Sequence, residues 1–199
     1  MSKHYSYTRS VRAKRRALWA MILFTLLASL LVLFVGRYPR AGFHLPTDWK
    51  SNAMTRSIFL NVRLPRIVLA LVAGAMLSAS GYAFQMLFSN PLVEPGFLGV
   101  SQGSAFGAAL MIVLGVGSTV LVQISAICFG LIALLASYLL AQRFRFGGWL
   151  LRLVLSGIAV SAIFSSGLAV IKLVAEPTKD LQDITFWMMG GLWNASWKQ

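Results

Sequence analysis

The chain has 199 residues, of which 58% are hydrophobic and 12% are charged. Soluble domains carry about 25% charged residues, so the composition excludes an ordinary soluble domain. The formal net charge of +13 lies in the flanks and loops of the apolar segments. That placement favours contact with anionic lipid beside a membrane over a nucleic-acid-binding surface.

Five segments of about twenty residues contain no charged side chain. They predict transmembrane helices over residues 17–36, 67–88, 97–116, 120–141 and 153–171. A helix of about twenty residues crosses a hydrocarbon core of roughly 30 Å, and a helix satisfies its own backbone hydrogen bonds in lipid. The alternation of apolar and polar residues expected of a membrane barrel is absent. We therefore expect an all-α polytopic membrane protein.

The polar flanks bear on orientation. Residues 1–16 form a basic tail, whose charges precede a first apolar segment that is long for a cleaved signal and lacks a small-residue cleavage site. We expect this helix to be retained. Basic residues are evenly divided between the two sides of the membrane, so only the usual dominance of the first helix favours a cytoplasmic amino terminus.

Between the second and third segments the sequence reads FSNPLVEPGFLGVSQGSAFG. Asn90 followed by Pro91 is typical of a helix N-cap with proline at the first helical position. Pro95 and Gly96 are then expected to break that short turn before the third helix begins. The pattern predicts a tight, pre-shaped connection.

Small residues recur at helical spacing in three of the predicted helices. Such faces let helix backbones approach closely, which is how membrane helices pack. They indicate a compact bundle, in which the same residues and Gln85 are candidates for helix packing or for the wall of a pathway. The residues are Gly74, Ser78 and Gly81 in the second helix, Gly99, Gly103 and Gly107 in the third, and Gly157, Ser161 and Ser165 in the fifth.

Catalytic, metal-binding and nucleotide-binding patterns are missing from the sequence. The spans hold no charged residue, which argues against a proton- or sodium-coupled pump. There is no GxxxxGK[ST] phosphate loop and no CxxC or HExxH pattern. We expect a chain that is not an enzyme and that binds neither a metal nor a cofactor. After the fifth segment, Phe186, Trp187, Trp193 and Trp197 indicate a headgroup-level region at the start of a sixth helix.

Several motifs, in order, resemble the FecCD family. They are RLPR at residues 63–66, NPLVEPGFLGV from Asn90, RLVLSG from Arg152 and FWMMGG from Phe186. The family comprises permease subunits of ABC importers for iron–siderophore complexes, haem and cobalamin. The resemblance covers about residues 56–199 and implies a type II importer bundle. Residues 17–199 would be its amino-terminal portion, because family subunits exceed 300 residues.

The resemblance also implies partners and sites. It predicts a second permease subunit, cytoplasmic ATPase subunits and an extracytoplasmic binding protein that docks on Arg63 and Arg66. It places the chain in the inner membrane with a cytoplasmic amino terminus. It assigns a gate region to the loop that contains Leu150 and Leu151, where a hydrophobic constriction can exclude water.

Two other functions remain open at this point. A secondary transporter or channel would need no ATPase and would respond to an ion gradient. A non-transporting fragment would leave its small-residue faces unpaired and would aggregate or be degraded. The function that the resemblance favours is import of an iron–siderophore complex, with ATP hydrolysed by a separate chain.

Overall fold

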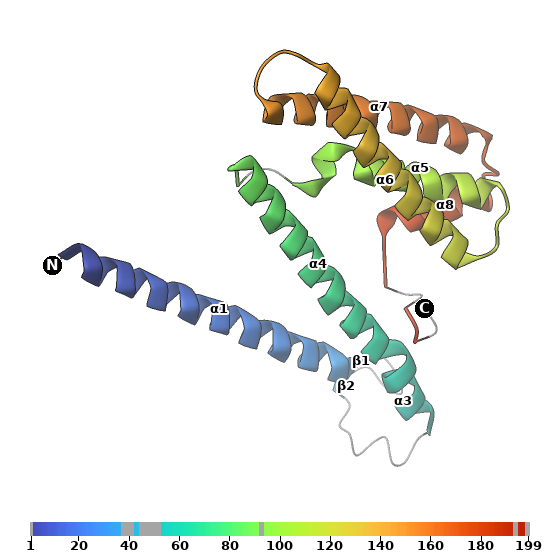
Figure 1. Cartoon of the computed structure of the whole chain (residues 1–199). Coiled ribbons are helices and arrows are strands. Elements are labelled where there is room, and N and C mark those ends of the chain that lie inside the picture. The colour runs from blue at the N-terminus through green and yellow to red at the C-terminus, as the bar shows by residue number, and fades with distance from the viewer. Residues whose placement is uncertain (1, 37–41, 44–52, 92–93, 193–194, 198–199) are drawn as a thin grey trace. The chain divides into compact units, whose positions relative to one another are not determined.

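A computed structural model describes residues 2–36, 42–43, 53–91, 94–192 and 195–197, with side chains from residue 12 onward except that of Pro95. The chain divides into two compact units. Unit 1 comprises Met1–Ala73 and Leu192–Gln199, and unit 2 comprises Gly74–Gly191. Helices dominate both units (Figure 1). Helix α4 runs from unit 1 into unit 2, and each unit is described by itself.

Unit 1 begins with one long helix, α1, over Ser2–Phe34. It starts fifteen residues before the predicted span at residue 17, so the basic tail is helical. Residues 2–16 contain neither proline nor glycine, and nothing in them stops a helix from extending out of the apolar segment. The part apolar enough to cross a membrane is Arg12–Phe34. Strand β1 (Val35–Gly36) follows and pairs antiparallel with β2 (Gly42–Phe43).

The second predicted helix is longer than the expected residues 67–88. It consists of α3 (Ala53–Ile58), a π-helical turn over Phe59–Arg63, which we call the π-turn, and α4 (Leu64–Phe88). The π-turn has a cause in the sequence. Pro65 has no N–H, and its ring collides with the carbonyl four residues earlier in an α-helix. A wider turn before the proline relieves that collision.

The third predicted span, residues 97–116, differs most from the expectation. A 3₁₀ turn over Pro95–Leu98 is followed by Gly99 with φ +80°, and α5 then covers Val100–Val113. Fourteen residues reach only about 21 Å, less than a hydrocarbon core of roughly 30 Å. The left-handed Gly99 separates the two helical pieces, because that backbone conformation favours glycine.

The remaining helices of unit 2 follow the prediction more closely. Helix α6 covers Thr119–Arg143 and α7 covers Trp149–Val174, a few residues longer than the predicted 120–141 and 153–171. Helix α8, Asp180–Met189, lies where a sixth helix was expected to begin. Its first turn carries Asp180 and Asp183, which suit the positive end of the helix dipole.

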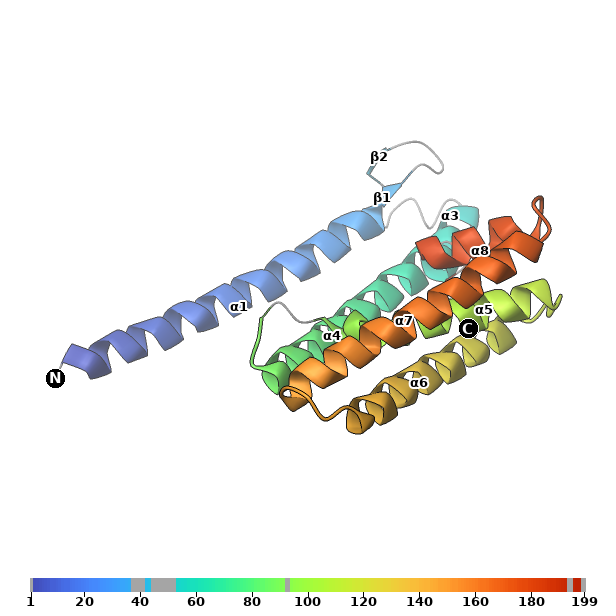
Figure 2. The ribbon, with the colours of Figure 1, turned by 90° about the horizontal axis from the view of Figure 1, so that it is seen from above.

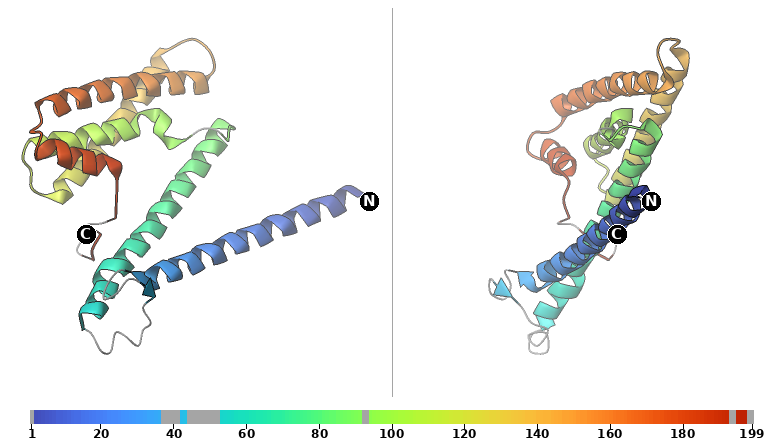
Figure 3. Two further views of the ribbon diagram at one scale, coloured as in Figure 1. Left: turned by 180° about the vertical axis from the view of Figure 1, so that it is seen from behind. Right: turned by 90° about the vertical axis from the view of Figure 1, so that its left-hand side faces the viewer.

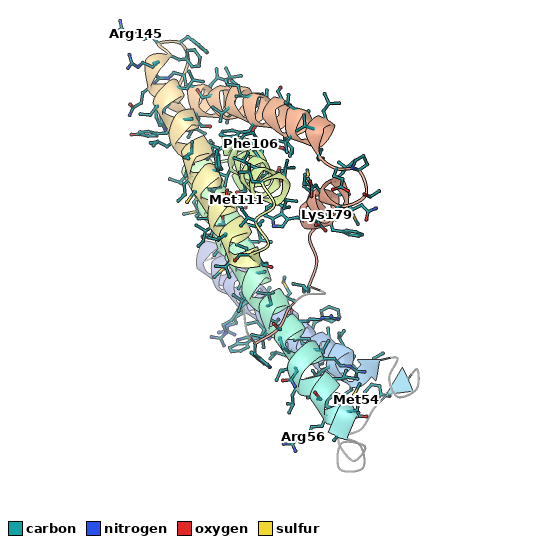
Figure 4. The ribbon with its side chains drawn as sticks, turned by 90° about the vertical axis from the view of Figure 1, so that its right-hand side faces the viewer. Met54, Arg56, Phe106, Met111, Arg145 and Lys179 are labelled. Carbon is teal, nitrogen blue, oxygen red and sulfur yellow. The ribbon has the colours of Figure 1, made fainter. Side chains whose placement is uncertain are left out.

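The core of unit 2 surrounds α5. This helix contacts α6, α7 and α8, and the views from above and behind show α6 and α7 beside it and α8 on its other side (Figures 2 and 3). Ala108 and Ala109 are fully buried. The ring of Phe106 lies 5.3 Å from that of Phe129 on α6 and 5.6 Å from that of Phe164 on α7, and it sits among these helices in Figure 4. A short helix is tolerated here because protein covers it.

Among the described residues, four helices are long and apolar enough to cross a membrane, namely Arg12–Phe34, Ala53–Phe88, α6 and α7. Helix α5 is apolar but shorter. The prediction of an all-α membrane bundle is confirmed. The expectation of five full-length spans changes to four such helices and a short, protein-covered α5.

Candidate functional site

The predicted docking arginines lie in unit 1 at the π-turn. Arg63 is the last residue of the π-turn, and Arg66 lies in the first turn of α4. Residues three apart on a helix are surface neighbours, and both side chains are partly exposed. The two guanidinium groups therefore belong to one local surface.

Arg63 also holds the end of α1. Its Nη1 donates a hydrogen bond to the Leu33 carbonyl oxygen at 3.2 Å, in the last turn of α1. A cation is favoured there by the negative end of the helix dipole. A Cβ added at Gly36 would collide with the Arg63 guanidinium, so the glycine leaves room for that group. Arg63 thus has a structural contact that sequence reasoning did not identify.

Unit 1 is strongly basic. It contains thirteen of the eighteen Lys and Arg residues and one of the five acidic residues, Asp48, which lies outside the described part of the chain. Cations that are not matched by nearby carboxylates create a positive potential, which attracts acidic partners. The arginine pair therefore belongs to a unit whose long-range field favours an acidic protein surface or anionic lipid.

In unit 2, the small residues of α5 do contact other helices closely, but not as one face against one partner. A Cβ at Gly103 would lie 2.6 Å from the Cβ of Ala133, and one at Gly107 would lie 2.7 Å from the Ser125 carbonyl oxygen; both neighbours belong to α6. A Cβ at Gly99 would instead meet Val160 of α7 at 3.3 Å. The three glycines therefore serve two interfaces.

The small residues of α7 are divided between buried and exposed positions. A side chain at Gly157 would collide with the Phe97 carbonyl oxygen, and Ser161 Oγ lies 3.4 Å from the position of a Cβ at Gly99. Ser165, however, is exposed. The buried stripe of α7 runs instead through Val160, Leu168 and Ile171, because a 3.6-residue repeat drifts away from strict four-residue spacing.

The small residues of α4 have no packing partner among the described residues of unit 2. Gly74 and Ser78 are exposed, Gly81 is partly exposed, and a Cβ at Gly74 or Gly81 would meet nothing within 4 Å. This face of α4 differs in that respect from those of α5 and α7.

Several packing residues of unit 2 were missed by sequence reasoning. Ser137 is buried and donates to the Leu98 carbonyl oxygen at 2.9 Å, and Ser125 donates to the Gly107 carbonyl oxygen at 2.8 Å. Ser137 thereby satisfies a carbonyl released where the 3₁₀ turn meets Gly99. The other missed positions are Gly130, Gly167 and Ser156, whose Oγ is buried without a hydrogen-bond partner in the described structure.

The connection before α5 is pre-shaped, although not in the predicted way. Asn90 and Pro91 lie in a turn after Ser89, whose φ is +47°, and the described chain resumes with a 3₁₀ turn over Pro95–Leu98. The predicted helical turn after Asn90 would include residues 92–93, which lie outside the described residues, so the N-cap assignment stays a prediction. The Asn90 N–H donates to the Gln85 carbonyl oxygen, and Gln85 Nε2 donates to the Pro91 carbonyl oxygen at 3.1 Å. Gln85 thus closes this turn. Gly96 follows Pro95 within the 3₁₀ turn.

The predicted gate residues Leu150 and Leu151 lie in the first turn of α7 and are exposed. The adjoining loop is held by Arg152, whose Nη1 donates to the Phe144 carbonyl oxygen at 2.7 Å. The Arg152 Cζ lies 5.8 Å from the centre of the Trp149 ring, which contacts the Tyr138 ring edge-on. In Figure 4 this loop, with Arg145, forms one end of unit 2. These contacts fix where α7 begins.

No group of three or more potential metal ligands occurs among the residues that were searched. Taken together, the geometry defines a polytopic helical membrane protein with a closely packed helical unit and a basic, arginine-bearing unit.

The chain belongs to the FecCD transport family, which matches residues 20–199. A solved structure assigned to the metal-chelate type of ABC transporter, in an inward-facing conformation, superposes with a TM-score of 0.79 at 32% identity. The match covers 92% of this chain and 56% of that one. The resemblance inferred from the motifs is confirmed.

Curated relatives are similar to nearly the whole chain. The molybdate import system permease protein MolB of Haemophilus influenzae is 33% identical over 92% of this chain and 56% of its own length. The vitamin B12 import system permease protein BtuC of Salmonella paratyphi A is 36% identical over 94% and 56%. The hemin transport system permease protein HmuU of Yersinia pestis is 35% identical over 86% and 53%. The chain thus spans about half the length of these relatives.

Proposed function

We propose that the chain is part of a permease subunit of an ATP-driven importer in the inner membrane, with its amino terminus in the cytoplasm. The observation that carries the proposal is the family match over residues 20–199. The lack of charged residues in the predicted spans supports it, because coupling to a proton or sodium gradient usually uses an ionisable residue within a span. ATP would be hydrolysed by separate cytoplasmic subunits, and a second permease subunit would complete the pathway.

The proposed route of the cargo involves α4, α5 and α7. The α4 face that carries Gly74, Ser78 and Gly81 is open within unit 2, which suits either the pathway wall or a further helix. Leu150 and Leu151, exposed at the start of α7, suit a hydrophobic constriction at the cytoplasmic end.

Docking of a binding protein on Arg63 and Arg66 forms the second part of the proposal. The basic character of unit 1 supports it, since charge pairs at the rim of an interface set orientation and on-rate more than affinity. Arginine also suits a carboxylate partner, because its planar fork donates two parallel hydrogen bonds.

The test uses the full-length permease assembled with its ATPase subunits in proteoliposomes. Reversing both charges, with Arg63→Glu and Arg66→Glu, is expected to abolish stimulation of ATP hydrolysis by the binding protein while membrane insertion is unchanged. A matched control reverses Lys179, an exposed residue before α8. Unchanged stimulation in the double variant would contradict the docking assignment.

The same proteoliposomes test the class of transporter. Uptake that stops when internal ATP is removed, and that ignores sodium and proton gradients, is the expected result. Uptake that survives ATP removal would favour a secondary transporter or channel instead. The proposed cargo is an iron–siderophore complex. If molybdate, cobalamin or haem competes with uptake of that complex, the competing compound becomes the preferred cargo.

A further inference from the structure

The π-turn releases one backbone carbonyl from the helix. The N–H of Leu64 donates to the Phe59 carbonyl oxygen, five residues earlier, instead of to that of Leu60. The following residue is Pro65, which has no N–H. The Leu60 carbonyl therefore receives a hydrogen bond neither in the α pattern, from Leu64, nor in the π pattern, from Pro65.

A side chain distant in the sequence supplies that missing donor. Trp197 Nε1 donates to the Leu60 carbonyl oxygen at 2.7 Å, across 137 residues. Both residues belong to unit 1. An indole has a single donor and no acceptor, so this hydrogen bond uses the whole polar capacity of the Trp197 side chain.

The π-turn determines where Arg63 points. A π-turn contains one more residue than the α-helical turn it replaces, and one residue of α-helix corresponds to a rotation of about 100°. If the turn relaxed to α-helical winding, Arg63 and Arg66 would rotate together relative to α3, and Arg63 would leave the Leu33 carbonyl. A hydrogen bond that forms only with the released Leu60 carbonyl therefore favours the arrangement in which Arg63 lies on the end of α1.

We propose that Trp197 is a positioning residue for the docking surface formed by Arg63 and Arg66. It acts through the Leu60 carbonyl, by stabilising the π-turn that sets the direction in which the two guanidinium groups point. This inference rests on the proposed docking function, and it extends that function to a residue that touches neither arginine in any contact described above.

The first test is Trp197→Phe, which retains an aromatic ring and removes the N–H. It is made in the full assembled transporter, and the readout is the binding-protein concentration that gives half-maximal stimulation of ATP hydrolysis. We expect that concentration to rise about three- to tenfold, as for the loss of one hydrogen bond, with basal and maximal rates unchanged. Trp19→Phe, on the exposed face of α1, is the matched control. An unchanged half-maximal concentration would overturn the proposal.

The second test is a double-mutant cycle with Pro65→Ala. Alanine restores an N–H at position 65, which can donate to Leu60 five residues earlier or return the turn to α-helical winding. In either case the Leu60 carbonyl no longer needs the indole. Trp197→Phe is therefore expected to have less effect in the Pro65→Ala background than alone. Equal effects in both backgrounds would show that Trp197 acts otherwise and would overturn the proposal.

Comparison with the double arginine variant separates this proposal from the docking function. If Arg63→Glu with Arg66→Glu abolishes stimulation while Trp197→Phe is silent, the positioning role fails and docking stands. If both are silent, docking fails and the positioning role with it. Should Trp197→Phe alone prevent assembly, the double variant with Pro65→Ala is expected to restore it, and failure of that rescue counts against the proposal.

Discussion

The two units of this chain differ in charge and in how closely their helices pack. Unit 2 contains four of the five acidic and five of the eighteen basic residues, so it is nearly neutral, and it buries small residues and serines around α5. Unit 1 carries most of the positive charge, and the apolar window of α1 is not buried within the described structure. Close packing therefore dominates unit 2, and long-range electrostatics dominates unit 1. Substitutions in the two units should therefore affect different measurements.

The largest expected effect is that of Gly157→Ala in unit 2. The added methyl group would collide with the Phe97 backbone carbonyl, and a backbone atom cannot move aside as the end of a side chain can. Overpacking of this kind costs about 3 kcal/mol. The measurement is thermal unfolding in detergent. Gly81→Ala, where the methyl group meets nothing within 4 Å, is the control and should have almost no effect.

Ser137→Ala should have the second-largest effect on stability. It leaves the Leu98 carbonyl without its buried donor, and an unsatisfied buried polar group costs about 1–3 kcal/mol. The same unfolding measurement applies, with the exposed Ser165→Ala as the matched control. Equal melting temperatures for the two variants would contradict the role assigned to Ser137 at the break before α5.

Ionic strength should affect unit 1 instead. If the basic residues of unit 1 guide an acidic binding protein, the association rate should fall about tenfold between 0.05 and 0.5 M salt, because the Debye length shortens. The double substitution Arg63→Gln and Arg66→Gln should reduce that dependence, whereas Lys179→Gln in unit 2 should not. Surface-immobilised binding protein and permease in nanodiscs provide the measurement.

Arg63→Lys is expected to have the smallest effect, and it separates the structural contact of Arg63 from its charge. Lysine keeps the positive charge but lacks the planar fork that reaches the Leu33 carbonyl. Stability should fall by about 1 kcal/mol, the usual contribution of one hydrogen bond, while the salt dependence of docking should stay the same. A change in salt dependence without a change in stability would indicate that Arg63 serves docking alone.

The helical fold could be predicted from composition because the lipid bilayer offers no hydrogen-bond partners to the backbone. Apolar segments of about twenty residues have no other way to satisfy their backbone in lipid, so α6 and α7 were placed within a few residues. The starts of α1 and α4 differ from the prediction because charge was used to end a helix. Helix α1 continues through Arg12–Arg16, because a run of basic residues without proline or glycine does not stop a helix.

The candidate site was predicted less completely. RLPR located Arg63 and Arg66, but the hydrogen bond from Arg63 to Leu33 joins residues 30 positions apart. Small-residue spacing identified Gly103 and Gly157 as packing positions, yet it gave equal weight to Gly74, which lies in open space. Spacing shows which residues share a helix face, and it carries no information on what covers that face.

The sequence by itself determined the membrane class, the main helices, the family and the positive charge of unit 1, because these follow from local composition and motifs. Only the tertiary structure decided that α5 is short and covered by protein, that Ser137 and Trp197 supply hydrogen bonds to released carbonyls, and that Arg63 lies on the end of α1. Each of these depends on contacts between residues that are distant in the sequence, and a local sequence pattern does not predict such contacts.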